Sequence, residues 1–323
     1  MNNRKIIIYW NGGGRLGNQL ITHAHLLAFI LEYPNQFLLI NTKFWYFNDL
    51  FPFSHIYPKP NAVYLKTLDF LLKICQLFPR KIFRFFTDII KMISFKRSNI
   101  NIIKIKNDND SIKLTPKIFE SDNTFLEGFR FRNWNLLHKH KSQILAKIQP
   151  NQKFKLISTN FINKLHLKSN FIIGVYIRQQ DYKVWLNGKY HFELTTYIKW
   201  INECEKVFES ENPLFIIVGD DAEVCIQVKN EVKNVAISNG DPLGKENYVV
   251  NMINLSKCNL IITPPSTFSG WASFMNNTPM IILKSENQII QKEDIVYNSI
   301  FDLHAFDEFT DEVFQSQKTT LML

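Results

Sequence analysis

The sequence predicts an α/β protein built from parallel sheets that helices cover on both faces. Short apolar, β-branched runs alternate with longer periodic segments, a pattern typical of strands that alternate with helices. The runs are apolar throughout, as expected of strands buried on both faces. With 323 residues, of which 46% are hydrophobic and 21% charged, the chain has a globular composition and room for one large domain or two medium ones.

The second half of the chain shows this alternation most clearly. Strands are predicted at residues 171–177, 214–218, 235–237, 260–263 and 280–283. Helical segments are predicted at residues 193–209, 247–256 and 267–276. Together these elements predict one parallel sheet covered on both faces.

The first half begins in the same way. It is predicted to contain a strand at 5–10, a glycine turn, a helix at 16–32, a strand at 37–40, a strand near Phe125 and a helical stretch at 134–148. The region between 45 and 110 shows no clear alternation.

Pro150 and the polar residues after it mark a domain boundary. We expect an N-terminal domain at 1–150 and a C-terminal domain at 151–323, with a ligand cleft between them. The last segment, 297–323, is expected to pack back across the domains.

The net charge of +9 is concentrated in one segment. Residues 65–106 carry ten Lys or Arg against only Asp69 and Asp88, with apolar residues among them. The segment is therefore predicted to form a basic amphipathic helix or helix pair. Such a helix can lie on an anionic membrane surface, or it can pack by its apolar face with its lysines in water. Because no recognised nucleic-acid module accompanies the patch, we expect no nucleic-acid partner.

The chain shows no membrane-spanning or secretory pattern. No stretch reaches the roughly 20 apolar residues that a bilayer span needs, and the apolar run near the start is too short for a signal peptide. The cysteines have no paired spacing, which argues against zinc and predicts reduced thiols: Cys75, Cys204, Cys225 and Cys258. We expect a cytoplasmic protein, either free or peripheral on the inner membrane surface.

The first candidate site is the glycine-rich turn at residues 11–19, between a strand and a helix. Its glycines permit a tight turn and close approach of a ligand, and the following helix offers free N–H groups to an anion. Arg15, Asn18 and Gln19 add polar side chains. The spacing fits neither a dinucleotide fingerprint nor a P-loop. The alternative is an ordinary strand-to-helix turn.

The second candidate site follows the strand at 171–177. Arg178 can hold a phosphate through its bidentate fork, and Lys183 can add a point charge. Asp181 can orient the arginine or cap the next turn, and a purely structural Arg–Asp pair is the alternative. His191 is expected to be solvent-exposed without a role.

The third candidate site follows the strand at 260–263. Ser266 is a good N-cap for the next helix, and its neighbours can hold a diphosphate at the helix start. Ordinary capping explains Ser266 alone, but it does not require Thr267 and Ser269.

In this order, the three segments resemble the motif set of the α-1,2-fucosyltransferase family. Residues 13–19 are similar to its Gly-Gly-Leu-Gly-Asn-Gln turn with Arg15 inserted, and are closer still to the protein O-fucosyltransferases. Residues 176–182 occupy the place of His-x-Arg-Arg-Gly-Asp-Tyr, and residues 266–271 that of Ser-Ser/Thr-Phe-Ser-Trp-Trp. Weaker similarity occurs at 127–129 and 255–258.

The resemblance implies a GT-B-like fold with two facing Rossmann-like domains. It also implies inverting transfer of fucose from GDP-β-L-fucose to a glycan hydroxyl in surface glycan synthesis, without a metal or other cofactor. The implied catalytic residues are Arg178, Asp181 and Asn18. The implied donor-binding residues are Gly14, Arg15, Gly17, Tyr176, Lys183, Asp220, Ser266, Thr267, Phe268 and Ser269.

Some positions depart from the family pattern. Tyr176 replaces a histidine, Gln179 and Gln180 replace Arg-Gly, and Asn251 replaces an aspartate. These departures leave open the donor sugar and the general base. Two alternatives therefore stand beside fucose transfer: the same fold with another nucleotide sugar, and a non-catalytic nucleotide- or glycan-binding module.

Overall fold

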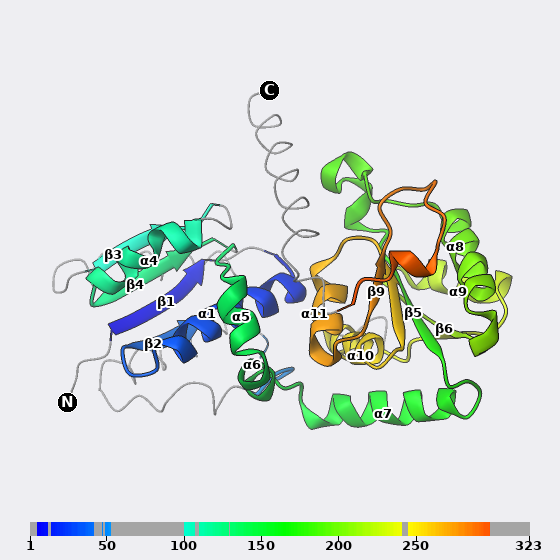
Figure 1. Cartoon of the computed structure of the whole chain (residues 1–323), viewed down its shortest axis with the longest axis horizontal. Coiled ribbons are helices and arrows are strands. Elements are labelled where there is room, and N and C mark those ends of the chain that lie inside the picture. Colours follow the sequence, from blue (N-terminus) through cyan, green and yellow to red (C-terminus); the bar gives the residue numbers. More distant parts are fainter. Residues whose placement is uncertain are drawn as a thin grey trace. The chain divides into compact units, whose positions relative to one another are not determined.

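The computed structural model describes residues 5–11, 14–41, 47, 49–52, 100–106, 110–128, 130–240 and 245–297. The chain divides into two compact units, Met1–Gln149 and Pro150–Leu323. Each unit is an α/β structure around its own parallel sheet (Figure 1).

The described strands of the first unit form a parallel sheet of order β2-β1-β4-β3. Its elements are β1 (Lys5–Asn11), α1 (Leu16–Glu32), β2 (Phe37–Asn41), β3 (Ile100–Lys104), α4 (Asp110–Glu120), β4 (Asn123–Glu127), α5 (Trp134–Lys139) and α6 (Lys141–Lys147). Ile7 and Tyr9 on β1 share a buried cluster with Leu26 and Phe29 on α1. The helix ends before Pro34, because the residue preceding a proline is disfavoured in helical conformation.

The described strands of the second unit form a parallel sheet of order β7-β6-β5-β8-β9. Its main elements are α7 (Gln152–His166), β5 (Ile172–Ile177), α8 (Leu194–Val207), β6 (Leu214–Gly219), α9 (Ala222–Glu231), β7 (Val235–Ile237), α10 (Lys245–Ser256), β8 (Leu260–Thr263), α11 (Thr267–Asn276) and β9 (Met280–Ile282). Short 3₁₀ turns, η2 (Asp181–Lys183) and η3 (Trp185–Gly188), lie between β5 and α8.

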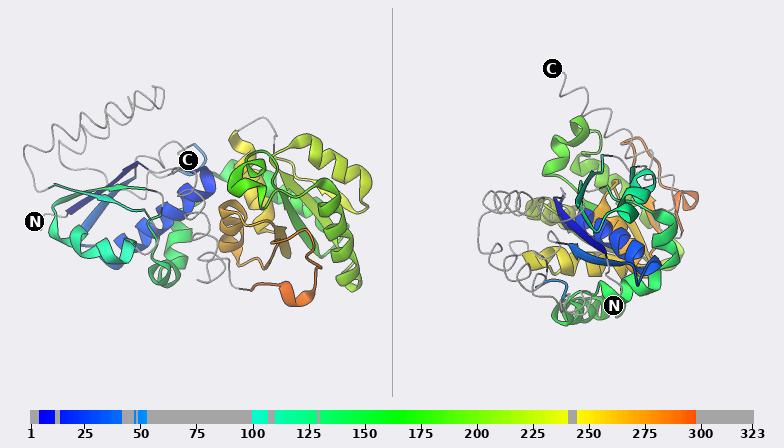
Figure 2. Two further views of the ribbon diagram at one scale, coloured as in Figure 1. Left: turned by 90° about the horizontal axis from the view of Figure 1, so that it is seen from above. Right: turned by 90° about the vertical axis from the view of Figure 1, so that its left-hand side faces the viewer.

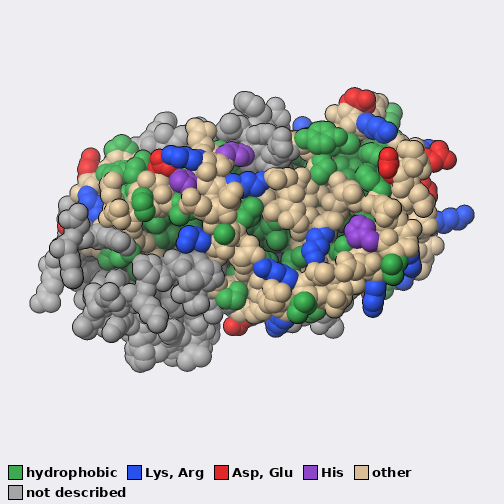
Figure 3. Space-filling model, turned by 60° about the horizontal axis from the view of Figure 1, so that its bottom comes forward, with side chains coloured by type: hydrophobic (Ala, Val, Ile, Leu, Met, Phe, Trp, Pro, Cys, Tyr) green, Lys and Arg blue, Asp and Glu red, His purple; other side chains and the backbone are tan. Residues whose placement is uncertain are grey.

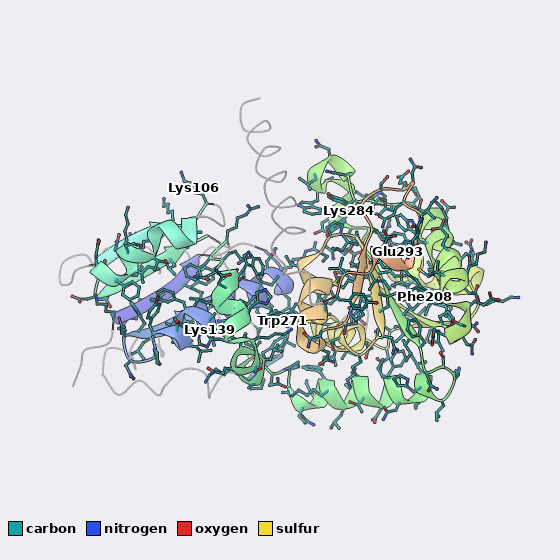
Figure 4. The ribbon with its side chains drawn as sticks, viewed as in Figure 1. Lys106, Lys139, Phe208, Trp271, Lys284 and Glu293 are labelled. Carbon is teal, nitrogen blue, oxygen red and sulfur yellow. The ribbon has the colours of Figure 1, made fainter. Side chains whose placement is uncertain are left out.

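Helices cover both faces of the second sheet (Figure 2). On one face, alternate strand residues such as Val175 share a buried cluster with Trp200 of α8 and Val228 of α9. The opposite face carries α10 and α11. Trp271 lies on α11 (Figure 4), and its ring centroid is 5.3 Å from that of Phe274 on the same helix. This layering is the α/β arrangement that the sequence predicts.

Three details correct the sequence-based expectations. The helical stretch at 134–148 is two helices, α5 and α6, which meet at the non-helical His140. Residues 100–104, placed within the basic helices, form strand β3, because this β-branched run pairs in register with β4. A helix that the sequence did not predict, α7, begins at the polar residues after Pro150, where the Asn151 side chain caps it by accepting from the Lys153 N–H at 3.1 Å.

Other expectations fall outside what the structure describes. These are the segment at 65–99, which holds most of the expected basic helices, Cys75, and residues 298–323 of the C-terminal segment. Within the described ranges, no helix is long and apolar enough to cross a bilayer. The same ranges hold no cluster of three or more His, Cys, Asp or Glu that could bind a metal ion.

Candidate functional site

The strand order of the second unit marks one edge of its sheet as the place for a ligand. From β5 the chain builds outward through β6 to β7, and then returns to the other side of β5 with β8 and β9. In open parallel sheets, ligands bind at the carboxyl ends of the strands where the order reverses. The segments that leave β5 and β8 therefore define the candidate site, and they are the second and third segments singled out in the sequence.

Arg178, the first residue after β5, is the centre of this site. It is 7% exposed, so its charge needs partners. Its Nη1 lies 3.0 Å from Asp220 Oδ2 and donates to Tyr176 Oη at 3.2 Å, while its Nη2 donates to the Asp181 carboxylate. The structure thus brings four of the predicted site residues into direct contact.

Aromatic rings enclose the guanidinium and connect the two segments. The Arg178 guanidinium carbon lies 4.9 Å from the Tyr182 ring centroid and 5.8 Å from that of Tyr176. The Tyr176 ring stacks on Phe268 of α11 at 5.0 Å and 28°. The Tyr182 hydroxyl donates to the Pro265 carbonyl. The chain after β5 is therefore held against the chain after β8.

The charges at the site are unevenly exposed. Arg178 contributes one positive charge and Asp181 and Asp220 one negative charge each, so the net charge is −1. The Asp220 side chain is 4% exposed and that of Asp181 is 37% exposed. A phosphate that approaches Arg178 would therefore displace Asp181 more readily than Asp220.

Burial affects the protonation of the groups around Arg178. Burial lowers the pKa of Arg178, but Tyr176, Asp220, Tyr182 and Asp181 raise it, and the net pKa lies above its usual value. Burial raises the pKa of Tyr176 to about 12. At neutral pH the site therefore presents a guanidinium cation and a protonated phenol.

The start of α11 is shaped by hydroxyl groups. Ser266 is the N-cap, as predicted, and its Oγ accepts from the Phe268 N–H at 3.2 Å. Ser269 is fully buried, and its Oγ donates to the Ser266 carbonyl at 3.1 Å and accepts from Thr263 at 2.9 Å. Ser269 thus stabilises the turn, whereas half-buried Thr267 is the first residue of the helix. The first N–H groups of a helix have no intrahelical acceptor, so this end can hold an anion.

The remaining predicted residues of this unit lie outside the contacts of Arg178. Lys183 is exposed on η2. The expectation that His191 is solvent-exposed is wrong: it is half-buried, and its Nε2 lies 2.9 Å from Gln179 Oε1. Gln179 also donates to the Phe192 carbonyl at 2.9 Å. Gln179, which stands where the family has an arginine, therefore holds the loop before α8 in place through these two contacts.

The first segment singled out in the sequence lies at the carboxyl end of β1, in the first unit. Gly14 has a φ of 88°, and a Cβ added there would lie 2.5 Å from Asn18 Cβ. Glycine therefore lets the Asn18 side chain fold against the turn. Exposed Arg15 is the N-cap of α1 without a side-chain capping bond, and Gly17 is buried in the first helical turn. These residues belong to the first unit and the Arg178 cluster to the second, in line with the two domains that the sequence predicts.

Sequence reasoning missed several buried polar residues. Tyr182 is the last residue of the second motif, residues 176–182. This position is the sequence signal that could have identified its ring contact with Arg178. In the first unit, Arg132 Nη1 donates to Thr22 Oγ1 at 3.1 Å, and Asn41 Nδ2 lies 3.0 Å from His23 Nδ1. No sequence pattern singled out this second group, because its members lie on separate elements.

The sequence matches the family model of glycosyl transferase family 11 over residues 14–298. The chain therefore belongs to glycosyl transferase family 11. A comparison with curated protein sequences gave no match.

Solved fucosyltransferase structures share the fold. A mutant of Arabidopsis thaliana FUT1 in complex with GDP is 13% identical, with a TM-score of 0.58 over 91% of this chain and 73% of that one. NodZ α-1,6-fucosyltransferase soaked with GDP-fucose is 14% identical, with a TM-score of 0.54 over 92% and 99%. Fucosyltransferase NodZ from Bradyrhizobium is 13% identical, with a TM-score of 0.55 over 91% and 99%. The family match and these folds confirm the resemblance to fucosyltransferases that the motifs indicate.

Proposed function

We propose that this glycosyltransferase moves L-fucose from GDP-β-L-fucose to a glycan hydroxyl, with inversion and without a metal. The observation that carries the proposal is the Arg178 cluster at the point where the strand order of the second sheet reverses. Membership of glycosyl transferase family 11 supplies the reaction class. The FUT1 structure with GDP and the NodZ structure soaked with GDP-fucose favour this donor.

Arg178 has the central chemical role in this proposal. As the glycosidic bond breaks, the departing GDP gains negative charge, which a fixed guanidinium and the N–H groups of α11 can stabilise. Asp220 holds Arg178 in place, and the more exposed Asp181 withdraws when the diphosphate binds. Removing such a clamp would raise the barrier by about 3–4 kcal/mol, as the loss of an oxyanion donor does.

The other site residues are proposed to position the donor and acceptor. Residues 151–323 would bind the nucleotide sugar, with Ser266, Thr267 and Phe268 along the donor and Lys183 adding charge. Residues 1–150 would face the acceptor, with Gly14, Arg15, Gly17 and Asn18 at its first turn. Asp181 fits the role of orienting Arg178 before the donor binds better than that of a base, because its carboxylate accepts from Nη2. We propose that the reaction occurs in the cytoplasm, in surface glycan synthesis.

One observation favours a second candidate, the same fold with another nucleotide sugar. The Gln179 amide contacts His191 and Phe192 and so does not replace the charge of a family arginine. A donor with different charge requirements would suit this change.

The test is release of free nucleotide from GDP-fucose, GDP-mannose, UDP-glucose and CMP-sialate in the presence of an array of glycan acceptors. Selective use of GDP-fucose, abolished in Arg178→Ala, supports the proposal. Proton NMR of the product anomer then tests inversion, and activity after EDTA treatment tests metal independence. Preference for another donor supports the second candidate, and GDP binding without turnover would indicate a binding module.

A further inference from the structure

The outward face of α7 combines basic charge with exposed aliphatic side chains. We propose that this face docks the protein onto an anionic lipid surface. The proposal is independent of the donor site, because it concerns a helix whose outward residues contact none of the Arg178 cluster in the described structure.

The helix has two distinct sides. Phe154, Ser158, Ile162 and Leu165 recur at helical spacing and are buried, and α7 packs on α10 of the same unit. Lys257 Nζ donates to Thr159 Oγ1 at 2.6 Å and helps to fasten this inner side. The opposite side is exposed, so its residues can meet a partner without unfolding the helix.

Exposed apolar side chains concentrate on that side. Of the eight large hydrophobic residues exposed in the described structure, three lie on α7 and its C-cap: Leu156 at 54%, Ile157 at 41% and Leu167 at 88%. Leu156 and Leu167 are three helical turns apart and therefore point to the same side. Scattered exposed hydrophobic residues need no explanation, but Leu156 and Leu167 share one face of α7, and Ile157 lies beside that face, about 100° around the helix, so together they favour a contact surface.

The charged side chains of α7 itself have one sign. No Asp or Glu occurs on α7 or beside it in the sequence, whereas lysines do. Four lysines, Lys153, Lys155, Lys164 and Lys168, lie on α7 or directly after it. Figure 3 turns the α7 side toward the viewer and shows basic and hydrophobic side chains interspersed along it.

This combination favours a lipid surface over other polyanions. A nucleic acid would attract the lysines but gain nothing from Leu167, which is almost fully exposed. An interfacial helix uses both: aliphatic side chains enter the headgroup region, and lysines bind anionic lipid. The long lysine side chains can cover apolar surface while their charges reach the headgroups.

The test is sedimentation of the full chain with vesicles of phosphatidylcholine alone or with one third phosphatidylglycerol. We expect binding only to the anionic vesicles. The double variant Lys164→Glu/Lys168→Glu should weaken vesicle binding at least about tenfold, because each lysine near an anionic surface contributes favourably to the binding free energy. The double variant Leu156→Ser/Leu167→Ser should weaken binding to the anionic vesicles severalfold. The control Lys206→Glu/Lys229→Glu, on exposed positions of α8 and α9, changes the net charge equally and should retain most of the binding.

Three results would overturn the proposal. The wild type could fail to sediment with anionic vesicles, or the control could lose as much binding as the α7 lysine variant. The leucine variant could also bind vesicles as the wild type does while RNA competes with the vesicles, which would indicate a general polyanion surface. Circular dichroism of each variant establishes that the changes leave the fold intact.

Discussion

Arg178 Nη1 lies 3.0 Å from Asp220 Oδ2, and the two residues follow the ends of the adjacent strands β5 and β6. Asp220 Oδ1 also accepts from the Gln179 N–H at 2.8 Å. One buried carboxylate therefore fixes both the guanidinium and the backbone that leaves β5. This double contact gives the arginine a fixed position before any ligand arrives, which is what electrostatic stabilisation of a leaving group requires.

Replacing Asp220 should destabilise the protein strongly. Asp220→Ala leaves the Arg178 charge buried without its main partner, and such losses cost about 3–5 kcal/mol of unfolding free energy. Urea denaturation measures the change. The neighbouring Asp221 is the matched control: it caps α9 by accepting from the Glu223 N–H at 3.0 Å, so Asp221→Ala should cost only about 1 kcal/mol. Equal losses for the two variants would contradict the importance of the buried pair.

Replacing Asp181 should strengthen nucleotide binding. Asp181 accepts from Arg178 Nη2, and its side chain is 37% exposed, so it competes with a phosphate for the same donor. Asp181→Asn removes one negative charge and should lower the Kd for GDP severalfold in calorimetric titration. The exposed Glu211→Gln serves as a charge control and should leave the Kd unchanged. A tenfold loss of affinity in Asp181→Asn would mean that the carboxylate itself holds the ligand.

Gly174 in β5 should not tolerate a methyl group. A Cβ at this position would lie 2.7 Å from Leu255 Cδ2 and 2.9 Å from Cys258 Sγ, where α10 packs on the sheet. Gly174→Ala should cost about 1–3 kcal/mol, the usual penalty of overpacking. In a double-mutant cycle, Leu255→Ala removes buried side-chain volume and should therefore cost less in the Gly174→Ala background than in the wild type, because it makes room for the added methyl group. A single variant as stable as the wild type would show that α10 does not pack so closely.

The buried His23 should make stability depend on pH. Burial lowers its pKa from 6.5 to about 3, while Asn41 lies 3.0 Å from its Nδ1. Between these values the unfolded chain binds more protons than the folded one, so the free energy of unfolding falls as the pH falls below about 6.5. His23→Gln cannot titrate, and its unfolding free energy should lose about 1.4 kcal/mol less per pH unit between pH 6 and 5. An unchanged slope in His23→Gln would refute the assignment.

Much of this structure is predictable from local sequence. The apolar runs that became β5, β6 and β8 were identifiable because each is buried on both faces, and Ser266 was identifiable as a cap from its position before a helix. Strand β3 was missed because a basic context outweighed its β-branched residues. α7 was missed because its polar start, directly after Pro150, was interpreted only as a domain boundary.

The site was predictable in part for similar reasons. Arg178 and Asp181 are three residues apart, so their pairing could be foreseen from spacing alone. The contacts of Tyr176 with Phe268 and of Tyr182 with Pro265 join segments more than 80 residues apart, and they depend on the strand order. Local patterns carry no information on such contacts until the sheet topology is known.

The central claim is that Arg178 holds the diphosphate of a guanine nucleotide. The most direct test is calorimetric titration of the wild type and Arg178→Ala with GDP, UDP and CMP. We expect selective GDP binding that weakens at least about tenfold in the variant, as the loss of a charged hydrogen bond predicts. Undiminished GDP binding by a folded Arg178→Ala, or no nucleotide binding by the wild type, would contradict the account.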